Sequence, residues 1–103
     1  MSIYLQVSIA LKSIEVTPRF LELMPQIAEG LGSFGWSLDA LYSANTGPIH
    51  HYFAIWKLHD ANALPKLSSD LRGNPPLMAK YLELLSCIAH EELTLLTRVL
   101  PTP

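Results

Sequence analysis

One stretch constrains the fold more than any other: residues 46–59, which read Thr-Gly-Pro-Ile-His-His-Tyr-Phe-Ala-Ile-Trp-Lys-Leu-His. A Gly-Pro turn opens this stretch, and the aromatic and β-branched residues after the turn favour a half-buried strand. The stretch also holds three of the four histidines and one of the two tryptophans. Protonatable groups among large apolar side chains are typical of the wall of a ligand pocket. The sequence therefore predicts a strand that lines a pocket.

Periodicity predicts the elements on either side. Residues 3–11 alternate between an apolar and a mixed face, which indicates a strand. Thr17-Pro18 is typical of a helix start, and the apolar residues that follow recur at helical spacing as far as Leu31. We expect Pro25 to kink or divide this helix, because proline removes a backbone donor. A second strand over residues 36–43 is predicted to form an antiparallel hairpin with residues 49–58.

The rest of the chain predicts two helical pieces and a closing strand. Asp60 is expected to cap a helix that carries Leu64, Leu67 and Leu71, and the sequence Gly-Asn-Pro-Pro at residues 73–76 breaks it. A further helix is predicted over 76–89, with Leu77, Met78, Tyr81, Leu82, Leu85 and Ile88 facing inward, and a last strand over 92–100. The order βαββαβ is that of α+β, ferredoxin-like folds, with a four-stranded antiparallel sheet and helices on one face. Residues 1–103 are expected to form one domain.

Composition favours self-association and argues against two classes of partner. Half of the residues are hydrophobic and 16% are charged, so we expect the open face of the sheet to be covered by a second copy, giving a homodimeric α/β barrel. Seven basic against nine acidic residues, with no basic run, argue against binding to nucleic acid. The sequence shows no signal peptide and no apolar run of membrane-spanning length, which predicts a cytoplasmic protein without membrane contact. The lone Cys87 is expected to be a buried thiol.

The hairpin and its surroundings resemble the NIPSNAP-type segment of dimeric α/β barrel proteins. The resemblance rests on the Gly-Pro turn at 46–49, the strand end Trp-Lys-Leu at 56–58 and the helix start at 60–64, with weaker likeness at 71–75 and 91–96. The chain departs from the family pattern at His50-His51, where a neutral polar residue is more usual, and at Leu58, where an aromatic residue is usual.

The resemblance implies a fold, a homodimer and a place in metabolism. Related barrels include cofactor-free monooxygenases, haem-binding proteins, isomerases and polyketide cyclases, and small single-domain versions resemble accessory proteins of bacterial secondary metabolism. In size, the chain is similar to the small accessory protein of prodigiosin pigment pathways, on the bipyrrole-forming branch. The resemblance implies a pathway protein that needs no cofactor, binds a small planar metabolite and acts beside a pathway enzyme.

Alternation along residues 50–59 divides the histidines between two faces. His50, Tyr52 and Trp56 are expected on one face, and His51 and His59 on the other. His50 is the candidate acid or base and Tyr52 the candidate orienting donor. The alternative reading makes His50 a structural or solvent-exposed residue.

Aromatic residues elsewhere complete a predicted box for a flat ligand. Trp36 and Tyr42 are expected to join Trp56 in this box, with Tyr4 and Gln6 adding polar tips and Arg72 lying at the mouth. The tryptophans also suit a role as core or dimer anchors, and Arg72 suits a solvated helix end.

No metal or cofactor is predicted. The histidines lack a recognised ligand spacing, and His90 with Glu91 or Glu92 would meet His51 only if the strands bring them together. Proton-transfer or cyclisation chemistry on a planar pyrrole-like or polyketide-like intermediate is the first functional hypothesis. The alternatives are a non-catalytic binding or chaperone module and a cofactor-independent monooxygenase.

Overall fold

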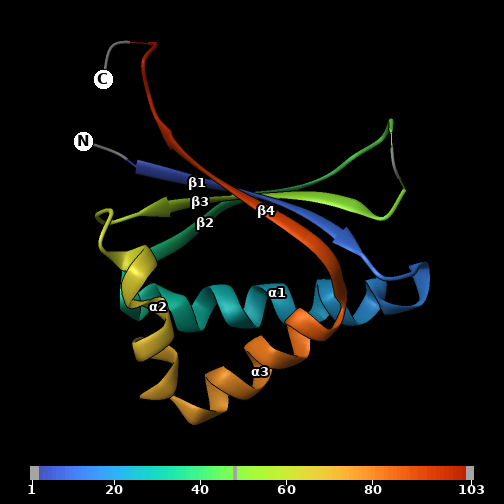
Figure 1. Ribbon diagram of the computed structural model, residues 1–103, viewed down its shortest axis with the longest axis horizontal. Helices are drawn as coiled ribbons and strands as arrows, with labels where there is room; N and C mark the ends of the chain where they lie inside the picture. The colour runs from blue at the N-terminus through green and yellow to red at the C-terminus, as the bar shows by residue number, and fades with distance from the viewer. Residues whose placement is uncertain (1–2, 48, 102–103) are drawn as a thin grey trace.

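The computed structural model describes residues 3–47 and 49–101, and it has one sheet layer and one helix layer (Figure 1). The sheet has the order β2-β3-β1-β4, and neighbouring strands are antiparallel. Its strands are β1 (Ile3–Leu11), β2 (Trp36–Ser43), β3 (His51–Leu58) and β4 (Ile88–Thr97). This arrangement confirms the predicted ferredoxin-like class. Pro48, in the predicted Gly-Pro turn, lies outside the described residues.

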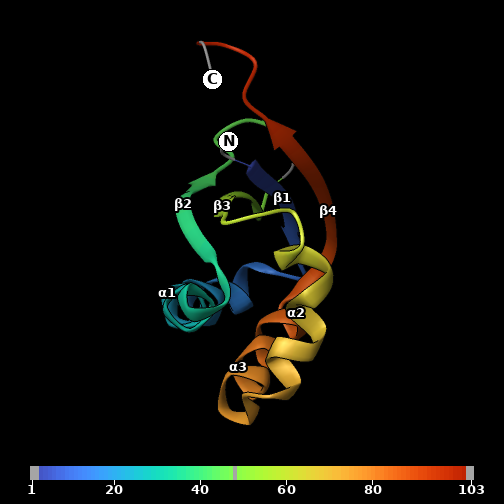
Figure 2. The same ribbon diagram turned by 90° about the vertical axis from the view of Figure 1, so that its left-hand side faces the viewer.

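Three helices lie against the same face of this sheet, as both views show (Figures 1 and 2). They are α1 (Thr17–Leu31), α2 (Ala63–Arg72) and α3 (Pro75–Ser86), and short 3-10 turns flank α1 at Ile14–Val16 and Gly32–Phe34. The opposite face of the sheet, which we call the open face, carries no helix among the described residues. None of the helices in residues 3–47 and 49–101 is long and apolar enough to cross a membrane.

The core lies between the sheet and the helices because β1 alternates as predicted. Its odd-numbered residues Leu5, Val7, Ile9 and Leu11 are buried on the helix face. The even-numbered residues from Tyr4 to Ala10 reach the open face and stay half-buried. Phe20 and Leu23 of α1 are fully buried against this wall, so the hydrophobic effect fixes which face of β1 the helices cover.

The structure corrects several predicted details of the helices. Helix α1 runs unbroken through Pro25, and Leu23 rather than Leu21 faces the core. In α3, Leu84 is buried whereas Leu82 is exposed. Asp60 does not cap α2 directly; its carboxylate accepts a hydrogen bond from the Asn62 N–H in the turn before the helix.

The chain turns from α3 into β4 earlier than predicted. Helix α3 ends at Ser86, and Ile88 already pairs with Leu11 of β1. The Lys12 N–H donates to the Cys87 carbonyl at 2.9 Å, which ties the end of the helix to the end of β1. The sheet thus recruits residues 88–91, which the sequence pattern assigned partly to a helix. Cys87 is buried, as predicted.

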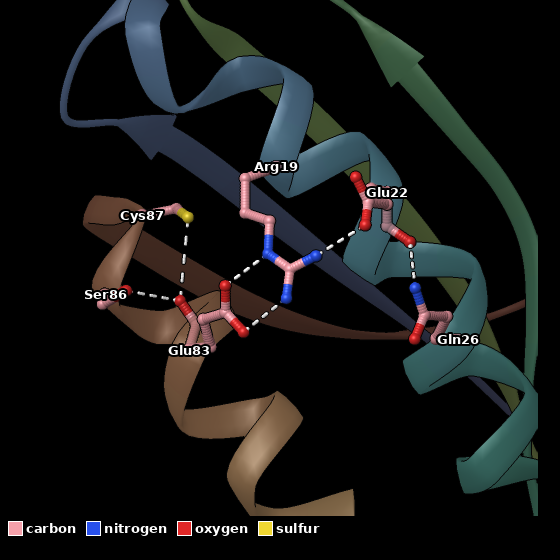
Figure 3. A network of polar contacts seen from close by, with 6 residues as sticks. All are labelled: Arg19, Glu22, Gln26, Glu83, Ser86 and Cys87. Atoms are coloured by element: carbon pink, nitrogen blue, oxygen red, sulfur yellow. Dashed lines mark hydrogen bonds and ion pairs between the residues drawn. The ribbon is translucent and has the colours of Figure 1, made fainter.

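A polar network joins α1 to α3 on the outer surface of the helix layer (Figure 3). The Arg19 guanidinium donates to both carboxylate oxygens of Glu83 and, at 2.6 Å, to Glu22. The Arg19 hydrogen bonds hold the pKa of Glu83 below its ordinary value and raise that of Arg19. The network therefore links the outer surfaces of the two helices, and it contributes little to stability because its side chains are exposed.

Candidate functional site

A cavity of about 70 Å³ lies between the sheet and the three helices. Its sheet side is formed by Trp36 and Trp56 together with Val7 and Ile9. Its helix side is apolar apart from one phenol, and it is formed by Met24, Ile27, Leu31, Leu67, Tyr81, Leu84 and Leu85, with Ile88 and Glu91 at the start of β4. Since a benzene-binding cavity measures about 150 Å³, the space suits a small group unless its wall moves.

The two tryptophans meet edge to face at the sheet side of the cavity. Their ring centroids are 5.6 Å apart and the ring planes make an angle of 80°, a geometry that the aromatic quadrupole favours. The strand register brings them together. Trp36 and Leu38 share one face of β2, and Leu38 pairs with Trp56 of β3, so the two tryptophans are diagonal neighbours. The sequence prediction that these residues share a wall is thus consistent with the fold.

The indole N–H of Trp36 has no hydrogen-bond partner among the described residues, although the side chain is only 4% exposed. A buried donor without a partner costs about 1–3 kcal/mol, so such groups are rare outside functional positions. The N–H belongs to a residue that lines the cavity. The cavity wall therefore includes one residue whose hydrogen-bond donor is unsatisfied and shielded from solvent.

Tyr81 and Glu91 supply the titratable groups of the wall. Burial, and then the Glu91 carboxylate nearby, raise the pKa of Tyr81. Glu91 is the only charged side chain among the described residues that line the cavity. The partly exposed lining residues all come from α2, α3 and the start of β4, so the polar rim of the cavity lies on that side.

Sequence reasoning missed both rim residues. The sequence pattern places Tyr81 on the inward side of the last helix. It offers Glu91 as a metal ligand and separates Glu91 from Glu92 on opposite faces of a strand, but it assigns neither to the pocket. Since β4 begins at Ile88, Glu91 pairs with buried Ile9 and faces the helices, whereas Glu92 pairs with Ser8 on the open face. The pattern of residues 88–97 contains this alternation, but the predicted end of the preceding helix concealed it.

The structure places the candidate catalytic residues outside the cavity lining. His50 stands before β3 rather than on it, in a turn with a φ of 61°. Its carbonyl accepts from the Leu11 N–H at 2.9 Å. Tyr52 lies on the helix face, and its ring contacts Phe20 at a centroid distance of 5.2 Å. The predicted pairing of His50 with Tyr52 on one strand face is therefore corrected.

Other members of the predicted aromatic box lie on the open face. Tyr4 pairs with Lys57 and Gln6 with Ile55, all on the side away from the helices. Tyr42 pairs with Phe53 on that same side and is 59% exposed. The structure thus separates these three residues from Trp36 and Trp56.

A β-bulge in β2 explains why Tyr42 and Trp36 face opposite ways. Leu38 pairs with Trp56 and Ala40 with Ile55, which leaves Asp39 without a partner across the strands. One extra residue reverses the alternation beyond that point. Simple period-two counting had placed positions 36, 38, 40 and 42 on one face.

The remaining predicted residue, Arg72, lies at the end of α2 and is exposed. Its guanidinium donates to the Ser68 hydroxyl at 3.1 Å, one turn earlier on the same helix. Arg72 is absent from the cavity lining. Within the described parts of the chain, no three His, Cys, Asp or Glu side chains gather closely enough to hold a metal ion.

Comparison with solved structures identifies other proteins that have this fold. A NIPSNAP family protein from Agrobacterium tumefaciens superposes with a TM-score of 0.80 at 14% identity, over 100% of this chain and 98% of that one. An uncharacterized NIPSNAP domain protein from Burkholderia xenovorans gives 0.75 at 16% identity, over 100% and 99% of the chains. The chain therefore has the fold of NIPSNAP-family proteins.

The same fold occurs in an enzyme. SnoaB, a cofactor-independent oxygenase from Streptomyces nogalater, superposes with a TM-score of 0.71 at 16% identity, covering 99% of this chain and 97% of that one. No family model matches the sequence, and a search of curated proteins finds no match. The NIPSNAP-type resemblance of the hairpin thus agrees with the structural neighbours.

Proposed function

We propose that this protein binds a small planar aromatic metabolite of bacterial secondary metabolism in the cavity between sheet and helices. The observation that carries this proposal is the composition of the wall: two edge-to-face indoles, aliphatic side chains and a rim with one phenol and one carboxylate. Such a lining suits a flat, weakly polar ligand. The cavity is smaller than one that holds benzene, so even a single pyrrole or benzene ring requires movement of flexible lining side chains such as Met24.

A cavity-filling variant tests this proposal. The probe is p-cresol, a small planar aromatic compound. In methyl NMR spectra, its binding is expected to shift the signals of Ile27, Leu84 and other lining residues. Leu85→Trp places a large side chain at the rim and is expected to weaken p-cresol binding by about tenfold or more. Leu82→Trp, on the exposed side of the same helix, is the matched control and should bind normally. Equal binding by both variants would contradict the proposal.

We further propose that the open face is covered by a second copy of the chain. It carries half-buried Phe53 and Ile55 at its centre, flanked by exposed Tyr42 and Leu96. Apolar and aromatic groups of this kind gain free energy when a second surface covers them. Two such faces packed together make the dimeric α/β barrel that the sequence resemblance implies.

Catalysis in the cavity would be a cofactor-free proton transfer, cyclisation or oxygenation. Fold similarity to the oxygenase SnoaB supports the last of these as the second candidate. Tyr81 and Glu91 are the titratable groups at the cavity, so Tyr81→Phe and Glu91→Gln should lower turnover. His50→Asn should have a smaller effect, because His50 is not part of the lining. If all three variants leave turnover unchanged, none of the three residues is catalytic. Absence of turnover in the wild-type protein would favour the alternative, a binding module that acts beside a pathway enzyme.

The genes beside this one would identify the substrate for such assays. Pigment or polyketide enzymes next to it would support a secondary-metabolite ligand, and a prodigiosin-type set would support the bipyrrole branch. Neighbours from primary metabolism would contradict this part of the proposal.

A further inference from the structure

Besides the Tyr81 phenol at the rim, two polar groups of the lining constrain what the cavity binds. Trp36 contributes a buried indole N–H without a hydrogen-bond partner among the described residues. Glu91 contributes the only charge in the described lining. An indole nitrogen can only donate, whereas a carboxylate can only accept and repels other anions. The indole therefore favours a ligand with a hydrogen-bond acceptor, whereas the carboxylate disfavours a ligand with negative charge.

From this arrangement we infer that the cavity selects an uncharged ring compound with an oxygen acceptor, held by the Trp36 N–H, and rejects carboxylates because of Glu91. This inference rests on the proposed function, since it concerns the same cavity. The indole nitrogen is shielded in this structure, so the lining must shift slightly for a carbonyl or phenol oxygen to reach it. That oxygen would then satisfy the donor in surroundings that are otherwise apolar, where an unmet donor is most unfavourable. A carboxylate would satisfy the donor too, but its charge would lie in the same small space as Glu91.

The walls around the indole support an acceptor from a ligand rather than from the protein. The residues that line the cavity with Trp36 on the sheet side are Val7, Ile9 and Trp56, and none of their side chains has an oxygen. The helix side facing them is formed mainly by aliphatic residues of α1 and α3. Tyr81 and Glu91 lie at the rim, and neither makes a hydrogen bond to the indole.

Trp56 presents the one competing arrangement. Because the two rings meet at 80°, the Trp36 N–H can also be directed at the face of the Trp56 ring, as a weak N–H···π contact. In that case the N–H signal would be shifted upfield in the free protein, and an acceptor would not move it. The two arrangements thus give different spectra.

NMR spectra of the ¹⁵N-labelled protein, recorded with three single-ring probes of similar size, test the inference. Acetophenone is neutral and offers an acceptor, toluene is neutral and offers none, and benzoate is an anion. The two indole N–H signals are assigned with Trp36→Phe and Trp56→Phe. We expect acetophenone to move the Trp36 N–H signal downfield, and toluene to shift only the methyl signals of the cavity.

Benzoate should bind about tenfold or more weakly than acetophenone, because two negative charges would share a site of low polarity. Glu91→Gln should remove most of that difference, whereas Glu92→Gln, on the open face, should not. Methyl shifts without a Trp36 N–H shift, or equal binding of benzoate, would overturn this inference and leave the proposed cavity site intact. No cavity shifts with any probe would overturn the proposed function and the inference together.

Discussion

The hydroxyl of Ser8 and Nε2 of His51 share a hydrogen bond of 2.7 Å on the open face of the sheet. The His51 ring also contacts the Phe53 ring, with centroids 5.0 Å apart. Ser8 lies on β1 and His51 on β3, so the pair spans two central strands. The open face is thus ordered by side-chain contacts of its own.

The first prediction concerns this face. Phe53→Glu should convert a dimer into a monomer, because a carboxylate at the centre of the interface would be desolvated; we expect its dimer dissociation constant to rise by about 100-fold or more. Sedimentation velocity at micromolar concentration measures the change. Leu82→Glu on the exposed side of α3 is the control and should remain dimeric. A wild-type mass of a single chain would contradict the dimer.

The second prediction concerns the contact of α1 with α3. A Cβ atom on Gly30 would lie 2.6 Å from Leu77 Cδ1, so Gly30→Ala should crowd the helix contact by about 1–3 kcal/mol. Better helix propensity offsets about 1 kcal/mol of this loss, and we expect a net destabilisation of about 1 kcal/mol in denaturant unfolding. Gly32→Ala is the control: it has a helical φ of −55° and no atom within 4 Å of the added Cβ. Equal stabilities of the two variants would show that Leu77 moves aside freely.

The third prediction concerns the ion pair of Arg19 with Glu83. Because Arg19 lowers the pKa of Glu83 in the folded protein, the stabilisation is complete above the ordinary value of 4.5 and is lost as pH falls through the lowered value. Glu83→Gln should therefore unfold at a slightly lower temperature at neutral pH, and its melting curve should converge with that of the wild type in acid. The effect is small because the pair is exposed. Glu29→Gln, at an exposed position on α1 outside this network, should leave the pH dependence unchanged.

The fourth prediction concerns Tyr81. Burial and the Glu91 carboxylate raise its pKa above the ordinary 10.0, so we expect its phenol to ionise only above that pH. Between 10.0 and the raised value the folded state holds a proton that the unfolded state has lost, so stability should fall as pH rises through that range. Ultraviolet absorbance of tyrosinate follows the titration. The difference between the titration curves of the wild type and Tyr81→Phe gives the Tyr81 step, and Glu91→Gln should lower its pKa only partly, because burial is the larger cause. A difference centred at or below the ordinary value of 10.0 would contradict the assignment.

The sequence predicted the fold well because strand alternation and helix spacing report directly on burial. Residues 3–11 and 36–43 were bounded correctly, and the split between the helix face and the open face holds for Phe53, Ala54 and Trp56. The C-terminal end of α3 was harder to predict from the sequence. Residues 88–91 are locally compatible with a helix, and only their pairing with β1 makes them a strand. Long-range pairing, rather than local propensity, decides that boundary.

The candidate site was predicted only in part for the same reason. Trp36 and Trp56 were placed on one wall from their alternation, and the structure brings them together. Glu91 required the true start of β4, and Tyr81 required knowledge of what its helix face meets. His50 was misplaced because β3 starts at His51, two residues later than predicted, which leaves His50 in the turn.

The bulge at Asp39 has a consequence for how this protein can change. The part of β2 before it contributes Trp36 to the cavity, and the part after it contributes Tyr42 to the open face. Substitutions at Trp36 therefore reach the cavity, whereas substitutions at Tyr42 reach the open face. The proposed ligand site and the proposed dimer face can thus be altered separately at two positions of one eight-residue strand.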